Sequence, residues 1–157
     1  MASWDDVRRI ARALPETAEE MKHGRQQDWR VKDKSFAWER PLRKGDIEAL
    51  GESAPDGPIL GVRTADEGEK LALIEEDPDV FFTTPHFNGY PAILVRLDAI
   101  DVDRLTELLT EAWFVQAPKR LAAEFLNSAS PPVRPDSGAK SGRAGGEAGG
   151  RRRNQPP

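Results

Sequence analysis

The feature that most constrains this chain is an Asn88-Gly89 dipeptide that lies between two apolar runs. Asn-Gly is among the strongest short signals for a β-hairpin, because both residues tolerate a positive φ. Counting outward from this turn pairs Thr84 with Ile93 and Phe82 with Val95. The pattern therefore predicts a hairpin whose tip carries aromatic side chains and one of whose faces is mostly apolar.

A second hairpin is predicted between Gln27 and Arg40. An Asp33-Lys34 turn would pair Val31 with Phe36, and it would place four large apolar side chains on one face. The opposite face would then carry polar and charged side chains, namely Arg30, Lys32 and Ser35.

Helix signals surround these hairpins. Ser3 is a good N-cap for a helix over residues 4–14, and Asp101 caps a helix with an apolar stripe that ends at Trp113. Thr64-Ala65-Asp66-Glu67 matches a capping box for a helix that buries Leu71 and Ile74 and ends near residue 76. A last helix is expected over residues 118–126, and residues 43–58 are expected to be a loop with one helical turn at 46–50. Residues 59–63 are expected to be a strand. Together these elements predict an α+β fold.

Length and composition predict one folded domain, residues 1–126, followed by a disordered tail, residues 127–157. Eleven of the 31 tail residues are Gly or Pro, and Val133 is its one large aliphatic residue, so the tail cannot bury enough surface to offset its ordering entropy. The chain has no cysteine, no apolar run of membrane-spanning length and no apolar signal-peptide core. We therefore expect a cytoplasmic protein that does not enter a membrane.

The charge is distributed unevenly along the sequence. Residues 1–126 hold 17 Lys and Arg against 25 Asp and Glu, whereas residues 127–157 hold six against two. An acidic body is a poor general binder of polyanions, because phosphate contacts dominate nucleic-acid affinity. Binding to nucleic acid would therefore need a local basic patch or the tail, in which Arg151-Arg152-Arg153 lies.

Signatures of enzymes are absent from the sequence. It has no Walker loop, no nucleophile elbow, no HExxH and no dinucleotide fingerprint. His23 and His86 are the only histidines, so histidine alone cannot form a metal triad. We expect no catalytic residue, no metal and no cofactor, although a site built only from carboxylates and lysine stays open.

The cations that could form a basic patch lie on the two hairpins and the last helix. Arg96 is expected opposite Phe81, within reach of a cation–π contact. Lys119 and Arg120 follow a proline near a helix N-terminus, where phosphate could be held. The candidate cations are Arg30, Lys32, Lys34, Arg96, Lys119 and Arg120, with Lys22 and Arg25 just upstream of the hairpin between Gln27 and Arg40. The alternative is ordinary surface charge, balanced by neighbouring acids.

Aromatic side chains and a histidine form the other candidates. His86 could hydrogen-bond a ligand or stack on a base, or it could simply fix the turn. Phe87 and Tyr90 could stack on bases or fold back onto the sheet. Trp113 belongs by default to the core, with a cleft beside Lys119 as the alternative.

Several segments of the chain resemble the MmcQ/YjbR-like family, and together they cover about residues 3–125. They are Trp4-Asp5-Asp6-Val7-Arg8, Ala13-Leu14-Pro15, Lys34-Ser35-Phe36-Ala37, Asp77–Phe82, Thr84–Pro91, Leu94–Leu97, Glu111-Ala112-Trp113 and Ala117-Pro118-Lys119-Arg120-Leu121. The resemblance implies a CyaY-like fold, in which helices pack on an antiparallel sheet. It also implies DNA binding through a double-wing arrangement of hairpins, a role that rests on fold analogy.

The expectation is thus a non-catalytic DNA-binding protein that contacts phosphates through hairpin tips and a local basic patch. The alternative is a module that binds a protein partner or a small ligand in a cleft near His86, Tyr90, Trp113 and Lys119.

Overall fold

The computed structural model describes residues 1–22 and 24–129, which fall into two compact units that divide after Pro118. In the described residues the first unit holds a six-stranded antiparallel sheet and four α-helices. The described part of the second unit is one helix, α5 (Lys119–Ala129). The predicted α+β fold class is confirmed.

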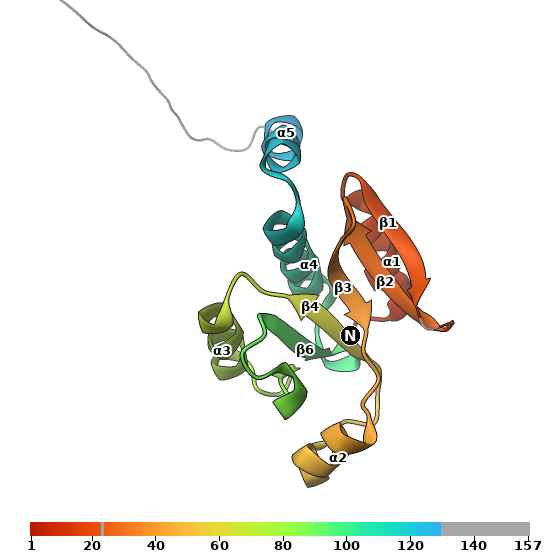
Figure 1. Cartoon of the computed structure of the whole chain (residues 1–157), viewed down its shortest axis with the longest axis vertical. Coiled ribbons are helices and arrows are strands. Elements are labelled where there is room, and N and C mark those ends of the chain that lie inside the picture. Colours follow the sequence, from red (N-terminus) through yellow and green to blue (C-terminus); the bar gives the residue numbers. More distant parts are fainter. Residues whose placement is uncertain (23, 130–157) are drawn as a thin grey trace, which may run out of the picture. The chain divides into compact units, whose positions relative to one another are not determined.

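The elements of the first unit are α1 (Trp4–Ala13), β1 (Thr17–Lys22), β2 (Gln26–Val31), β3 (Lys34–Glu39), α2 (Lys44–Leu50), β4 (Ile59–Arg63), α3 (Glu67–Glu76), β5 (Phe81–Phe82), β6 (Ala92–Arg96) and α4 (Val102–Gln116). The strands lie in the order β1-β2-β3-β4-β6-β5, and all neighbours are antiparallel. Figure 1 shows β1 to β4 and β6 in this order. Three short 3₁₀ turns are η1 (Gly51–Ser53), η2 (Pro85–Phe87) and η3 (Leu97–Ala99).

The main core lies between the sheet and two helices, α1 and α4. Helix α4 packs against β3 and β4, and α1 packs against β1 and α4. Fully buried side chains in this core include Val7, Trp29, Phe36, Leu105 and Trp113. Burying such side chains contributes roughly 1.5–3 kcal/mol each, so this face holds the unit together.

A smaller core lies on the opposite face, over β4, β5 and β6. It joins Ile59, Phe82, Phe87, Ala92 and Leu94, with Trp38, Leu42 and Leu50 packed against it. Strands β4 and β6 are therefore covered on both faces, which explains why their residues form continuous apolar runs.

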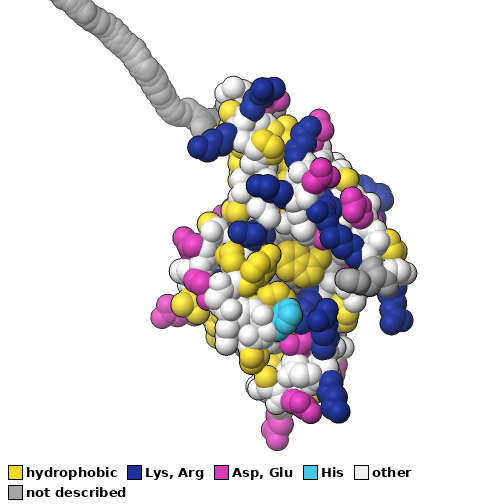
Figure 2. All heavy atoms as spheres, viewed as in Figure 1, with side chains coloured by type: hydrophobic (Ala, Val, Ile, Leu, Met, Phe, Trp, Pro, Cys, Tyr) yellow, Lys and Arg dark blue, Asp and Glu magenta, His cyan; other side chains and the backbone are white. Residues whose placement is uncertain are grey.

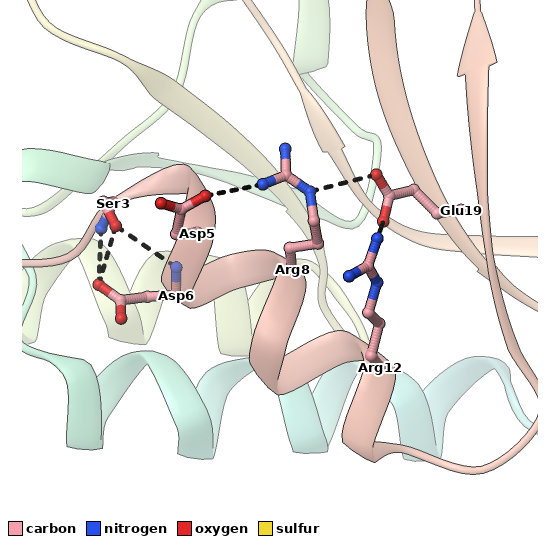
Figure 3. A network of polar contacts seen from close by, with 6 residues as sticks. All are labelled: Ser3, Asp5, Asp6, Arg8, Arg12 and Glu19. Atoms are coloured by element: carbon pink, nitrogen blue, oxygen red, sulfur yellow. Dashed lines mark hydrogen bonds and ion pairs between the residues drawn. The ribbon is translucent and has the colours of Figure 1, made fainter.

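The start of α1 is fixed as predicted. Ser3 caps the helix, and the carboxylate of Asp6 accepts a hydrogen bond from the Ser3 backbone N–H at 3.0 Å (Figure 3). Arg8 then links Asp5, at 2.9 Å, to Glu19 of β1, at 3.4 Å, and Glu19 also pairs with Arg12. This network ties α1 to a strand that the sequence patterns did not reveal.

The predicted hairpin between Gln27 and Arg40 exists, but its predicted turn and register are wrong. The turn residues are Lys32 and Asp33, both with positive φ, as in a type I′ turn. A bulge between Trp29 and Arg30 then shifts the pairing, so that Trp38 lies opposite Asp28. As a result, Trp38 leaves the face that the sequence predicted and takes part in the smaller core.

The register of the predicted hairpin around Asn88-Gly89 is also one residue from the prediction. Phe82 pairs with Leu94, not with Val95, because the connection is not a two-residue turn. Pro85 begins the turn η2, and Gly89 alone of the Asn-Gly pair has a positive φ, +78°. Arg96 consequently lies over the ring of Phe82, 5.1 Å from its centroid, rather than over Phe81.

The predicted cap of α3 is wrong as well. Asp66, not Thr64, accepts a hydrogen bond from the N–H of Glu69, at 2.8 Å, and the helix begins at Glu67. Its buried residues include Lys70 and Leu73, whereas Leu71 is 60 % exposed. The predicted strand over residues 59–63, the Asp101 cap and the helical turn within residues 43–58 are confirmed.

The predicted tail, residues 127–157, lies outside the described residues from residue 130 onward, as does His23. Helix α5 runs to Ala129 rather than Leu126, and the domain boundary at residue 126 stays a prediction. Within residues 1–22 and 24–129, no helix combines the length and the apolarity that crossing a membrane requires.

Candidate functional site: a cationic and aromatic cleft

The face of β1–β3 that is turned away from the main core carries a cleft of about 440 Å³, bordered by the turn η2. This volume falls in the range of small-ligand pockets, roughly 300–1,000 Å³. On the face seen in Figure 2, a histidine lies beside apolar side chains and several Lys or Arg side chains. The lining residues are Lys22, Gln26, Gln27, Asp28, Ser35, Trp38, Glu39, Arg40, Arg43, His86, Phe87 and Tyr90.

Trp38 owes its place in the cleft to a glycine on the neighbouring strand. A Cβ at Gly61 would stand 2.5 Å from two atoms of the Trp38 indole, so the ring lies directly against the backbone of β4. The partly exposed indole forms one wall of the cleft and also packs against the smaller core. Because an indole is rigid, this wall is fixed in position before any ligand arrives.

The loop that carries His86 and Tyr90 is held by a buried lysine. Lys70, 2 % exposed, donates from Nζ to the carbonyl oxygens of Phe87, at 2.6 Å, and Tyr90, at 3.0 Å. Its ammonium also lies 3.1 Å from a carboxylate oxygen of Glu67. Helix α3 therefore anchors this loop by charge-assisted hydrogen bonds, which are stronger than neutral ones.

Arg40 is a buried cation at the wall of the cleft. Its Nη1 lies 3.0 Å from Asp46 and donates to the carbonyl oxygen of Pro41 at 2.6 Å. Its guanidinium stands 5.1 Å from the centroid of the Phe87 ring. Within the described part of the chain, its Nη2 is buried without a hydrogen-bond partner. A buried donor of this kind is costly unless something binds it.

The pKa of Asp46 reflects this arrangement. Burial by itself raises the pKa of this carboxyl group. The hydrogen bond from the Arg43 backbone N–H, at 2.9 Å, and the charge of Arg40 outweigh burial and hold the pKa below its usual value. Asp46 is therefore ionised near neutral pH and keeps the Arg40 side chain in place.

The acids of the cleft already have partners. Asp28 accepts from Arg30 at 2.9 Å and from the hydroxyl of Ser35, and Lys22 lies 3.5 Å away. Glu39 accepts the backbone N–H of Gln27 at 2.6 Å. Arg43, in contrast, is exposed, and among residues 1–22 and 24–129 no acid forms an ion pair with it. Because Lys22 pairs with Asp28 and Arg40 with Asp46, Arg43 is the cation of this cleft that has no acid partner among the described residues.

The predicted site residues are only partly brought together. His86 and Tyr90 line the cleft, and both are exposed. Arg30 lies beside it, paired with Asp28. Arg96 pairs across the sheet with Ile59, at the opposite end from Arg30.

The remaining predicted cations lie elsewhere. Lys32 occupies the turn between β2 and β3 and lies 3.4 Å from Glu16, and the exposed Lys34 begins β3. Lys119 and Arg120 belong to α5, in the second unit.

Trp113 lies in the main core rather than in the cleft. Its side chain is fully buried, and its indole N–H donates to the carbonyl oxygen of Pro15 at 2.9 Å. This matches the core role that the apolar stripe of its helix indicates.

The residues of the cleft that the sequence analysis did not propose as candidates include Trp38, Arg40 and Arg43. For Trp38, the signal that could have revealed its place is the position of the hairpin turn. A turn at Lys32-Asp33, together with the bulge, places Trp38 on the same face of the sheet as Asp28. No described group of His, Asp and Glu residues is arranged to hold a metal ion.

Comparison with known proteins places the chain in a family. The YjbR family model matches residues 12–115. The chain belongs to the YjbR family. Two relatives of this YjbR protein, "Uncharacterized protein Rv2570" of Mycobacterium tuberculosis and "Uncharacterized protein Mb2600" of Mycobacterium bovis, are each 60 % identical over 129 residues, which cover 80 % of this chain and 97 % of the relative.

A solved structure resembles the fold. The crystal structure of Deinococcus radiodurans protein DR2400, described as a DUF419 domain, superposes with a TM-score of 0.56 and 21 % identity. The match covers 73 % of this chain and 78 % of that one. At this level of identity the similarity concerns the fold alone.

Proposed function

We propose that this YjbR protein is a non-catalytic DNA-binding protein, and that its interface is the open face of the sheet around the cleft. One observation carries the proposal: in a body with an excess of acids, three cations gather around aromatic side chains in one cleft. The cations are Lys22, Arg40 and Arg43, and the aromatic rings include Trp38 and Tyr90. Cations next to exposed rings are the usual means of binding phosphates and bases together.

Further contacts extend this surface beyond the cleft. The guanidinium of Arg63 stands 5.6 Å from the centroid of the Tyr90 ring, so another cation borders the aromatic wall. The cleft acids are held by internal partners, which limits their repulsion of a phosphate. The proposed interface is therefore the cleft and not the hairpin turn. The charge of Lys32 in that turn is partly neutralised by Glu16.

The test is a titration of labelled DNA, single-stranded and duplex, with the full chain at a series of salt concentrations. We expect affinity to fall steeply as salt rises, because bound phosphates release counterions. The double variant Lys22→Gln/Arg43→Gln should weaken binding at least tenfold. Arg9→Gln/Arg12→Gln on α1 is the matched control, since it also removes two positive charges but at residues that do not line the cleft.

Two results would refute this interface: no binding even at low salt, or equal losses from both double variants. Replacing Arg151, Arg152 and Arg153 with Gln in the full chain separates the contribution of the tail to DNA binding from that of the folded face. If that change alone abolishes binding, the folded face is not the interface.

A second candidate function is favoured by the concavity of the site. A cleft in which polar groups converge also suits a small anionic ligand or an extended segment of a partner protein. Thermal-shift measurements with a panel of small carboxylates and phosphates would test the first of these. If a small anion stabilises the protein, Arg43→Gln removes this stabilisation and the protein does not bind DNA, the result would favour small-ligand binding over DNA binding.

A further inference from the structure

We propose that the cleft is a subsite for a single unstacked nucleotide, and that the DNA this protein prefers is therefore single-stranded. This inference rests on the proposed function and specifies its ligand. The bases of a duplex are stacked inside the helix, and a concave site reaches a base only after it has left the stack. A cleft of about 440 Å³ is of a size for one nucleotide.

The base-binding part of the subsite is the aromatic wall. The Trp38 indole lies against Gly61 on one side and borders the cleft with its partly exposed surface. Tyr90, 46 % exposed, stands on a loop that Lys70 holds in place. A base of any kind can stack on such rings, because every base has a π-face.

The phosphate-binding part is the pair Arg40 and Arg43. Arg40 is held by Asp46 and by the Phe87 ring, so little side-chain freedom remains to be lost on binding. Arg43 adds an exposed guanidinium three residues further along the chain, and both arginines line the same cleft. A planar guanidinium suits the oxygens of a phosphate.

The geometry also argues against a cationic ligand. Asp28 and Glu39 are the carboxylates that line this cleft, and both are engaged by donors of the protein itself. A cation would have to displace these contacts, whereas an anion would meet the exposed guanidinium of Arg43.

The test compares three probes at one low salt concentration: a fluorescently labelled oligo(dT) of twelve nucleotides, a duplex of the same length, and free dTMP. We expect the single strand to bind at least tenfold more tightly than the duplex. Arg43→Gln should weaken single-strand binding, and Arg9→Gln should not. Tyr90→Ser, at an exposed position, should weaken it as well.

Tryptophan fluorescence provides a second readout with unlabelled oligo(dT). Trp29 and Trp113 are fully buried, whereas Trp38 and Trp4 are partly exposed. A base stacked on Trp38 should quench its emission. Trp38→Phe should remove this quenching, and Trp4→Phe, the matched control, should retain it.

The outcomes separate this inference from the proposed function. Equal affinity for duplex and single strand, or quenching that persists in Trp38→Phe, would overturn the subsite and leave DNA binding intact. No binding of either DNA would overturn both. If dTMP binds as tightly as the oligonucleotide, the ligand is a free nucleotide and the preference for a strand is refuted.

Discussion

The replacement of Lys70 by Met offers the sharpest test of how the cleft is built. The ammonium of Lys70 lies inside the protein and donates to two carbonyl oxygens of the loop that carries His86 and Tyr90. Met has a similar length and keeps the apolar packing of the lysine stem. It removes the charge and both hydrogen bonds, so the carbonyls of Phe87 and Tyr90 lose this donor.

The expected cost follows from these two bonds. A hydrogen bond to a charged group contributes roughly 1.5–3 kcal/mol, so the loss of two amounts to about 3–6 kcal/mol. Met no longer requires a buried charge to be desolvated, which offsets part of this loss. We expect the free energy of unfolding to fall by about 3 kcal/mol, a large share of the roughly 5–15 kcal/mol that small domains possess.

Urea unfolding followed by far-UV circular dichroism measures this difference. Lys44→Met, at an exposed lysine of α2, is the control and should lie within about 0.5 kcal/mol of the unchanged protein. The folded Lys70→Met protein should also bind oligo(dT) more weakly, because Tyr90 is no longer fixed. A loss of stability below 1 kcal/mol would refute the anchoring role of Lys70.

Other changes test the remaining supports of the site. Gly61→Ala would drive a methyl group into the Trp38 indole and should cost about 1–3 kcal/mol and shift the tryptophan emission spectrum. Ser3→Ala removes the cap of α1 and should lower the melting temperature, at a cost of about 1 kcal/mol. Asp46→Asn leaves Arg40 without its counter-charge and should cost about 3 kcal/mol in urea unfolding at pH 7.

The Asp46 carboxylate also predicts a pH dependence. Its pKa is lowered in the folded protein, so the unfolded chain binds its proton at higher pH than the folded chain does. The stability from the carboxylate is therefore present above the unfolded pKa and is lost as the pH falls through the folded pKa. The stability difference between the protein and Asp46→Asn should shrink over that acid range. A difference that stays constant down to acid pH would contradict this assignment.

The elements that could be predicted from the sequence are those whose signals lie within a few residues of each other. Ser3 with Asp6 and Asp101 each place a polar side chain where a helix leaves N–H groups unpaired, and these caps are found as predicted. The apolar run of residues 59–63 likewise predicted a strand. These predictions hold because the residues that interact are close together in the sequence.

The tertiary structure alone decided how the strands align and which residues meet in the cleft. A bulge after Trp29 and a 3₁₀ turn at Pro85 each shift the predicted pairing, and a shift in register changes which side chains meet across the sheet. Lys70 shows the same limit, since its buried ammonium is stabilised by carbonyls 17 and 20 residues away. No local pattern encodes such partners, because they come together only when α3 packs beside the loop.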